Sequence, residues 1–159
     1  MALKGLRKVA QWDTAWIYDD TITADVAAGG IVALKTAGSG EALDSSANVC
    51  AYHSNGSGVM ALGILVAEIT TDNVTANPRN LQRNKVPKGS KVELIRVGEV
   101  LTNMVLGTPT AGANAELAAI GFIALGTHTQ TVGNVVVGKF LDTLDEDGYV
   151  KVYVNCPAT

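Results

Sequence analysis

The chain has few of the residue types that usually perform catalysis. Its 159 residues include only two histidines and two cysteines, and aromatic residues make up 5%. His53 and His128 both stand in Gly-, Ser- and Thr-rich stretches, and neither has the spacing of a metal-ligand pair. The sequence has no P-loop, GxSxG or HExxH motif, and no GxGxxG that follows a strand and opens a helix. We therefore expect neither an enzyme nor a cofactor.

Strong charge and long apolar runs are also missing. The net charge is −3 and the pI is about 5.3, which argues against a nucleic-acid partner. The longest apolar run, Val59 to Ala67, is far shorter than the roughly 20 residues that span a membrane. The first eight residues do not resemble a signal peptide, so we expect folding in a cytoplasm. Cys50 and Cys156 form no metal-binding pattern, and we expect both to be reduced and buried.

The charged residues that are present are unevenly placed. Asp142, Asp145, Glu146 and Asp147 form an acidic group that lacks the pattern of a calcium loop, and a hairpin turn explains it better. Half of the basic residues fall in one stretch, which is either a solvated face or a docking patch for an acidic surface. They are Arg79, Arg83, Lys85, Lys88, Lys91 and Arg96.

Short apolar segments separated by Gly, Pro and Asn turns run from residue 20 to residue 155. Such a pattern predicts strands. We expect strands over 21–23, 31–34, 49–52, 59–69, 91–97, 99–106, 117–125, 135–141 and 149–154. The predicted fold class is all-β, a small β-barrel or β-sandwich with Gly-rich turns and an N-terminal arm. Residues 1–20 would form the arm, and residues 21–159 a single β domain.

The β domain contains a faint internal repeat. Gly63 and Gly138 each stand inside an apolar strand, and a Gly-rich turn precedes each strand at a similar distance. Glycine inside a strand often marks a bulge or a close approach between backbones. Either the match is due to chance in an Ala/Gly/Val-rich sequence, or two similar β units build the domain.

The N-terminal segment differs from the rest of the chain. Leu3, Leu6, Val9, Trp12 and Trp16 are spaced by three or four residues, as in a short amphipathic helix. The segment either packs on its own domain or anchors the chain to a partner. For the second case, the candidate binding residues are Lys4, Leu6, Arg7, Lys8, Trp12 and Trp16. Deleting residues 2–16 would then leave a folded domain that no longer binds.

The second half of the chain carries a specific resemblance. The stretch Gly89-Ser-Lys-Val-Glu-Leu-Ile-Arg-Val-Gly-Glu-Val-Leu-Thr is followed by Gly107-Thr-Pro-Thr-Ala-Gly, then Val137-Gly-Lys-Phe-Leu, then Asp145-Glu-Asp-Gly-Tyr-Val-Lys-Val-Tyr-Val. This order of segments is similar to head decoration (cement) proteins of tailed bacteriophages. The resemblance covers about 65 residues, and Ala28-Gly-Gly-Ile-Val-Ala-Leu extends it weakly upstream. The N-terminal segment lies outside it.

The resemblance implies a structural role on the virion. Such proteins bind the outside of the capsid and cross-link neighbouring major capsid subunits, with no membrane or nucleic-acid partner. It also implies a homo-oligomer, most often a trimer, and the apolar runs 59–67 and 117–125 either offer surface for one or are simply core strands. Two alternatives stay open: another virion component, such as a head-fibre base or minor tail protein, and a small carbohydrate-binding module that uses Tyr149 and Tyr153.

Overall fold

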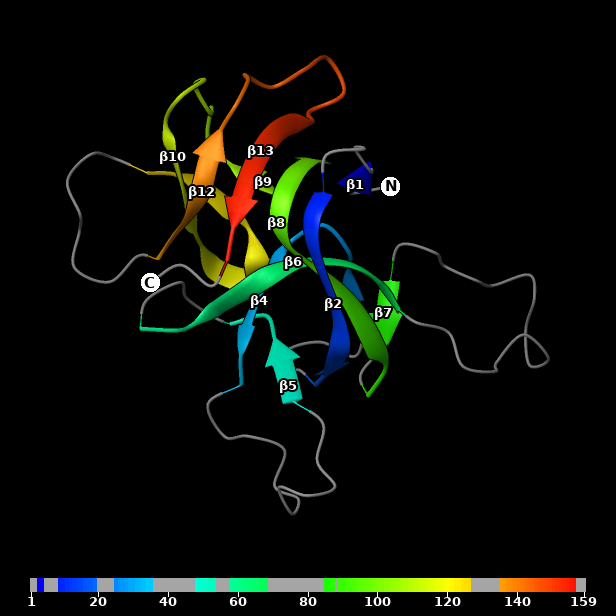
Figure 1. Ribbon diagram of the computed structural model, residues 1–159. Helices are drawn as coiled ribbons and strands as arrows, with labels where there is room; N and C mark the ends of the chain where they lie inside the picture. Colours follow the sequence, from blue (N-terminus) through cyan, green and yellow to red (C-terminus); the bar gives the residue numbers. More distant parts are fainter. Residues whose placement is uncertain are drawn as a thin grey trace.

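Almost every regular element of the chain is a β-strand, and the longest, β8 (Lys91–Thr102), belongs to both layers of the fold (Figure 1). The structure is a computed structural model. It describes residues 3–4, 9–19, 25–35, 48–53, 58–68, 85–87, 89–126 and 135–156. The all-β prediction is confirmed.

Five strands close into a barrel. Their order is β2 (Val9–Tyr18), β5 (Asn48–Ala51), β4 (Ile31–Leu34), β6 (Ala61–Glu68) and β8, and β8 pairs back onto β2. The β2–β5 pair is parallel and the other barrel pairs are antiparallel. Closing the sheet leaves these strands without a free edge. The barrel alternative of the prediction is therefore correct.

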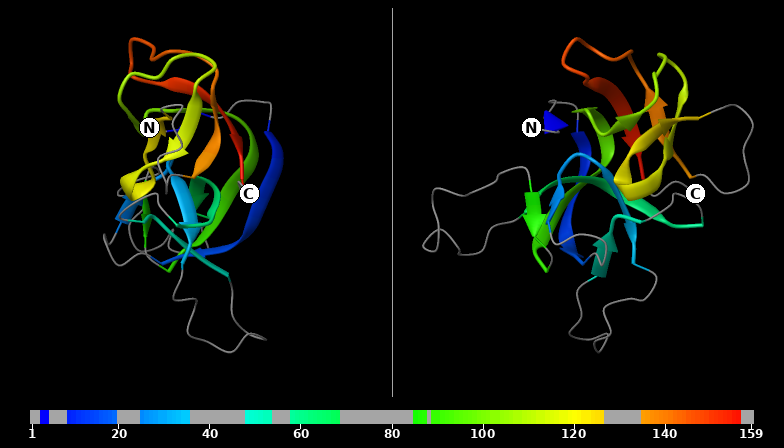
Figure 2. Two further views of the ribbon diagram at one scale, coloured as in Figure 1. Left: turned by 90° about the vertical axis from the view of Figure 1, so that its left-hand side faces the viewer. Right: turned by 180° about the vertical axis from the view of Figure 1, so that it is seen from behind.

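Beyond the barrel, the same sheet extends from the C-terminal half of β8, and we name this part the C-terminal sheet. It continues through β13 (Val150–Asn155), β12 (Val136–Phe140), β10 (Asn114–Leu117), β11 (Ile123–Leu125) and β9 (Val105–Leu106). Figure 2 shows this sheet beside the barrel from two further directions. The short β1 (Leu3–Lys4) pairs with the end of β8, while β3 (Asp25–Ala27) and β7 (Lys85–Pro87) form a separate two-stranded sheet.

The two layers explain why the barrel strands read as unbroken apolar runs. One buried cluster, the barrel core, contains Trp16, Tyr18, Val32, Cys50, Tyr52, Leu62, Leu65, Val86, Val92, Leu94 and Met104. A second, the interlayer core, joins β4, β6 and β8 to the C-terminal sheet and contains residues such as Ile64, Ile95, Phe140 and Val152. Successive side chains of a strand point to opposite faces, so β4 and β6 supply both cores. The run Ala61–Leu65 is wholly buried. For these residues the core-strand alternative is therefore correct, and they supply no exposed surface for oligomer contacts.

The two strand glycines allow neighbouring backbones to approach closely, as predicted. A Cβ at Gly63 would lie 2.6 Å from the carbonyl oxygen of Ile95, and a Cβ at Gly138 would overlap the carbonyl oxygen of Tyr153. The neighbours of the two strands differ: β6 lies between β4 and β8, whereas β12 lies between β10 and β13. The glycines are thus locally alike, and the division into two similar units stays a prediction.

Three details of the expected strand pattern are wrong. Residues 91–102 form one strand instead of two. The apolar run 117–125 is interrupted by a 3₁₀ turn, Ala119–Gly121, because Ile120 adopts a left-handed conformation with φ 56° and ψ 38°. The N-terminal helix is not formed in the described part of residues 1–20, where the chain builds β1 and β2. The expected strand over Thr21–Thr23 lies outside the described residues.

Both cysteines behave as predicted. Cys50 and Cys156 are free thiols, with 0% and 2% of their surfaces exposed, and they belong to different buried clusters. Burial raises the pKa of the Cys50 thiol to about 12, although a hydrogen bond with its own backbone lowers the pKa slightly. Both thiols therefore serve as small apolar side chains.

Candidate interaction surfaces

The N-terminal segment was our first candidate for a binding surface, and the structure changes its role. Val9–Tyr18 forms β2, which pairs with β8 from Val9 to Ile17 and with β5 from Trp16 to Tyr18. Trp16 is 8% exposed and lies in the barrel core. Its indole Nε1 donates a hydrogen bond of 2.8 Å to Asp13. Trp16 is therefore part of the chain's own fold and is not an exposed anchor.

The other predicted anchor residues are only partly described. Trp12 lies in β2 opposite Ile95, and Lys4 lies in β1 opposite Leu101, but the directions of both side chains fall outside the description. Leu6, Arg7 and Lys8 lie outside the described residues. The prediction that residues 1–20 form an arm is thus wrong for Val9–Tyr18, which is a strand of the barrel. The segment Ala15-Trp-Ile-Tyr, rich in residues that favour strands, was the signal that the helical spacing obscured.

The group of basic residues does not form a described patch. Only Lys91 and Arg96 have described side chains; Lys91 is exposed, and Arg96 lies 3.5 Å from Asp13 in an ion pair across β2 and β8. Arg79, Arg83 and Lys88 lie outside the described residues. For Arg96 the structure therefore favours a role within the fold.

A first surface surrounds His53 at the end of β5. Three exposed apolar residues are linked to it through backbone hydrogen bonds or neighbouring backbone: Leu34 (37% exposed), Met60 (46%) and Ile120 (42%). Leu34 N–H donates to the Met60 carbonyl at 2.9 Å, and Ile120 N–H donates to the His53 carbonyl at 2.7 Å. The His53 Nε2 lies 3.0 Å from the Leu34 carbonyl oxygen. We name Leu34, His53, Met60 and Ile120 the His53 surface.

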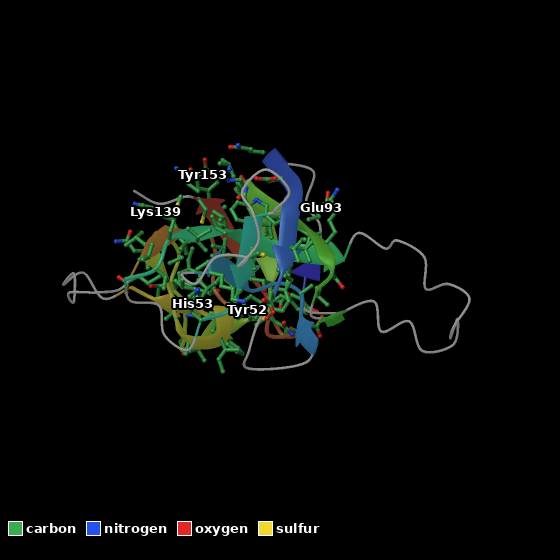
Figure 3. The ribbon with its side chains drawn as sticks, turned by 90° about the horizontal axis from the view of Figure 1, so that it is seen from below. Tyr52, His53, Glu93, Lys139 and Tyr153 are labelled. Carbon is green, nitrogen blue, oxygen red and sulfur yellow. The ribbon has the colours of Figure 1, made fainter. Side chains whose placement is uncertain are left out.

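The unusual backbone of Ile120 is held in place by Tyr52. Gly121, the next residue, packs directly on the Tyr52 ring, at a φ of 75° that suits glycine. The Tyr52 hydroxyl donates to the Ala27 carbonyl at 2.8 Å and accepts from Gly30 N–H at 3.1 Å. Figure 3 shows Tyr52 and His53 side by side. A β-branched residue in the left-handed region costs roughly 1–2 kcal/mol. The fold therefore presents an exposed isoleucine at some energetic cost, which is more common at functional sites.

A second surface covers the outer side of β12 and β13. Lys139 lies opposite Tyr153, and Leu141 N–H donates to the Lys151 carbonyl at 2.8 Å, so these four residues form two neighbouring pairs. Lys139, Leu141 and Tyr153 are exposed and Lys151 is half-buried, while Phe140, Val152 and Val154 between them are fully buried. Figure 3 shows Lys139 and Tyr153 close together. We name Lys139, Leu141, Lys151 and Tyr153 the hairpin face.

The hairpin face offers a single exposed tyrosine. Tyr153 is 39% exposed, whereas Tyr149 is 8% exposed. The pair of exposed aromatics that a carbohydrate-binding module would use here is therefore not formed.

The acidic residues occupy the connection between β12 and β13, as the predicted turn. The Asp145 side chain accepts hydrogen bonds from Asp147 N–H at 3.0 Å and Tyr149 N–H at 2.7 Å, and Gly148 follows at a φ of 78°. Asp142, Asp145, Glu146 and Asp147 are all exposed. We name residues 142–147 the acidic turn. Throughout the described ranges, no group of three or more His, Cys, Asp or Glu residues could hold a metal ion.

No protein-family model matches the chain, and no curated protein matches its sequence. In the part of the chain that the structure describes, no helix is long and apolar enough to cross a membrane. His128 lies outside that part.

Proposed function

We propose that this chain is a head decoration protein of a tailed bacteriophage. It would bind the outer surface of the capsid and stabilise it by cross-linking neighbouring major capsid subunits. One observation carries the proposal: the segments that resemble such proteins form β8, β13 and β12, which are adjacent strands of one sheet. The resemblance therefore corresponds to one structural unit, and scattered chance matches would not be expected to coincide with neighbouring strands.

Among the described residues, the His53 surface is the one best suited to contact the capsid. Its three exposed apolar residues come from β4, the approach to β6 and the 3₁₀ turn. Backbone hydrogen bonds join Leu34 to Met60 and Ile120 to His53. Exposed apolar patches commonly mark protein–protein contacts. One of these side chains, Ile120, is exposed on a left-handed backbone that an isoleucine rarely adopts. Such strained residues are more common at functional sites.

Binding to a lattice does not require a strong single contact. A capsid presents many copies of each subunit, so a second contact made by the same molecule, or by an oligomer, is effectively intramolecular. Modest burial of three apolar side chains at each contact would then give slow release. The protein would reside on the capsid exterior after synthesis in the host cytoplasm.

The test is to add the purified chain back to capsids stripped of decoration, from the phage that encodes it. Ile120→Asn should lose capsid affinity by about tenfold or more, since one buried apolar contact is removed. In the same variant the free energy of unfolding should rise by about 1 kcal/mol, because asparagine tolerates the left-handed conformation. Denaturation in urea would measure this change. Leu106→Asn is the control: Leu106 is 46% exposed but lies on β9, outside the His53 surface.

Two results would contradict different parts of the proposal. If wild-type protein does not bind stripped capsids, or if antibodies locate it on the tail or on fibres, the chain is not a head decoration protein. If it binds and Ile120→Asn binds equally well, the function stands and the His53 surface is not the contact.

A further inference from the structure

The hairpin of β12 and β13 carries two surfaces of opposite charge. The hairpin face holds the cations Lys139 and Lys151, and the acidic turn directly beyond it holds four exposed carboxylates. Among the described residues, neither lysine forms an ion pair, and neither do Asp142, Glu146 or Asp147. Glu99 on β8 is paired across the strands with Tyr153, so this described carboxylate lies beside the two lysines of the hairpin face.

The geometry of the hairpin keeps these two surfaces apart within one chain. The side chains of the hairpin face stand perpendicular to the sheet, whereas the acidic turn continues along the strands past Leu141. The two hydrogen bonds to Asp145 and the backbone bond from Asp145 N–H to the Tyr149 carbonyl at 2.8 Å fix the shape of the turn. The turn is therefore a preformed, solvent-exposed acidic projection.

Apolar side chains accompany both charges. Leu141 (42% exposed) and Tyr153 (39%) lie on the hairpin face, and Leu144 (38%) lies in the acidic turn. A contact between the two surfaces would bury these side chains around a set of opposite charges. Tyrosine is enriched at protein interfaces, and opposite charges across an interface fix its register.

We propose that the acidic turn of one copy binds the hairpin face of a second copy. Glu146 and Asp147 would lie against Lys139 and Lys151, and Leu144 would pack on Leu141 and Tyr153. Because the two surfaces differ, the contact is head-to-tail, and repetition would produce a ring if the rotation closes. This interface is separate from the His53 surface, so it does not depend on the proposed capsid function.

The test measures self-association of the full chain by sedimentation at about 20 mM and about 500 mM salt, conditions that change screening strongly. Wild-type protein should associate at low salt and dissociate at high salt. Lys139→Glu together with Lys151→Glu should raise the dissociation constant about tenfold or more, and so should Glu146→Lys together with Asp147→Lys. Circular dichroism confirms that each variant is folded.

The charge-swapped chain gives the decisive comparison. Combining all four substitutions keeps the net charge at −3 but restores opposite charges on the two surfaces. It should associate more tightly than either double variant. The control compares the dissociation constants of two single variants, Lys91→Glu and Lys139→Glu. Lys91 is also exposed but lies at the barrel end of β8, so its substitution should weaken association less than that of Lys139.

Three results would overturn the proposal. They are a wild-type chain that stays monomeric at low salt, a swapped chain that associates no better than the double variants, and equal weakening by Lys91→Glu and Lys139→Glu. Association that depends on an added acidic protein, and never occurs between copies, would also overturn it in favour of a different partner.

Discussion

Gly138 stands where two strands approach more closely than any side chain allows. A Cβ there would overlap the Tyr153 carbonyl, which belongs to the backbone of β13 and cannot rotate away. We expect Gly138→Ala to lower the free energy of unfolding by about 3 kcal/mol, the upper range for overpacking. Denaturation in urea would measure it.

Gly112 provides the matched control for this substitution. It has a positive φ of 84°, but nothing lies within 4 Å of its missing Cβ. Gly112→Ala should therefore cost only the roughly 1 kcal/mol of a left-handed alanine. Equal costs at the two positions would show that close packing between β12 and β13 is not what requires glycine.

Cys50 links stability to alkaline pH. Burial raises its thiol pKa from 9.0 to about 12, so above pH 9 the unfolded chain has lost a proton that the folded chain retains. The free energy of unfolding should then fall as pH rises towards 12, by up to about 1.4 kcal/mol per unit. Urea denaturation at several pH values should show this slope in wild-type protein and a shallower slope in Cys50→Ala. Identical slopes would mean that Cys50 does not cause the loss.

Among the elements, β2 shows that the N-terminal segment belongs to the barrel and is not a separate arm. It closes the barrel between β5 and β8 and brings Trp16 and Tyr18 into the barrel core. Its identity as a strand was not predicted, because Leu3, Leu6, Val9, Trp12 and Trp16 also fit a helical spacing. Only the partners of β2, which lie far away in the chain, decide between the two.

Deleting residues 2–16 now has a different expected outcome. The deletion removes most of β2, exposes the barrel core along β8 and should give a chain without a cooperative unfolding transition in circular dichroism. Deleting residues 2–8 leaves β2 intact and should preserve that transition. A folded, monomeric 2–16 deletion would show that β2 is dispensable and would restore the interpretation of the segment as an arm.

Other elements could be read directly from the sequence. The alternation from Tyr149 to Val154 predicted β13, because one face of that strand is buried and the other is exposed. The prediction of one strand over 117–125 was wrong because non-local contacts interrupt it. Its interruption at Ile120 depends on His53 and on the Tyr52 ring that supports Gly121, contacts that no local pattern contains.

At the scale of the whole molecule, composition and turn pattern were sufficient to predict an all-β barrel or sandwich. They did not reveal that β4, β6 and β8 face two cores at once. Continuous apolar runs are typical of strands buried on both sides, and for Ala61–Leu65 the core-strand alternative is the correct one. The His53 surface was likewise not predictable, since Leu34, His53, Met60 and Ile120 are apolar or neutral residues that only the packing of the barrel against the C-terminal strands brings together.

The closure of the barrel also determines when the molecule can fold. β2 begins at Val9, but its main partner β8 does not end until Thr102. At ordinary rates of translation, roughly 5 to 20 seconds separate the synthesis of these two strands. Trp16 and Tyr18 have no native partner strand in β8 during that interval, and such non-local pairing is intrinsically slow. The barrel therefore cannot close until β8 has been made, and before then β5 is the only barrel strand available to pair with Trp16–Tyr18.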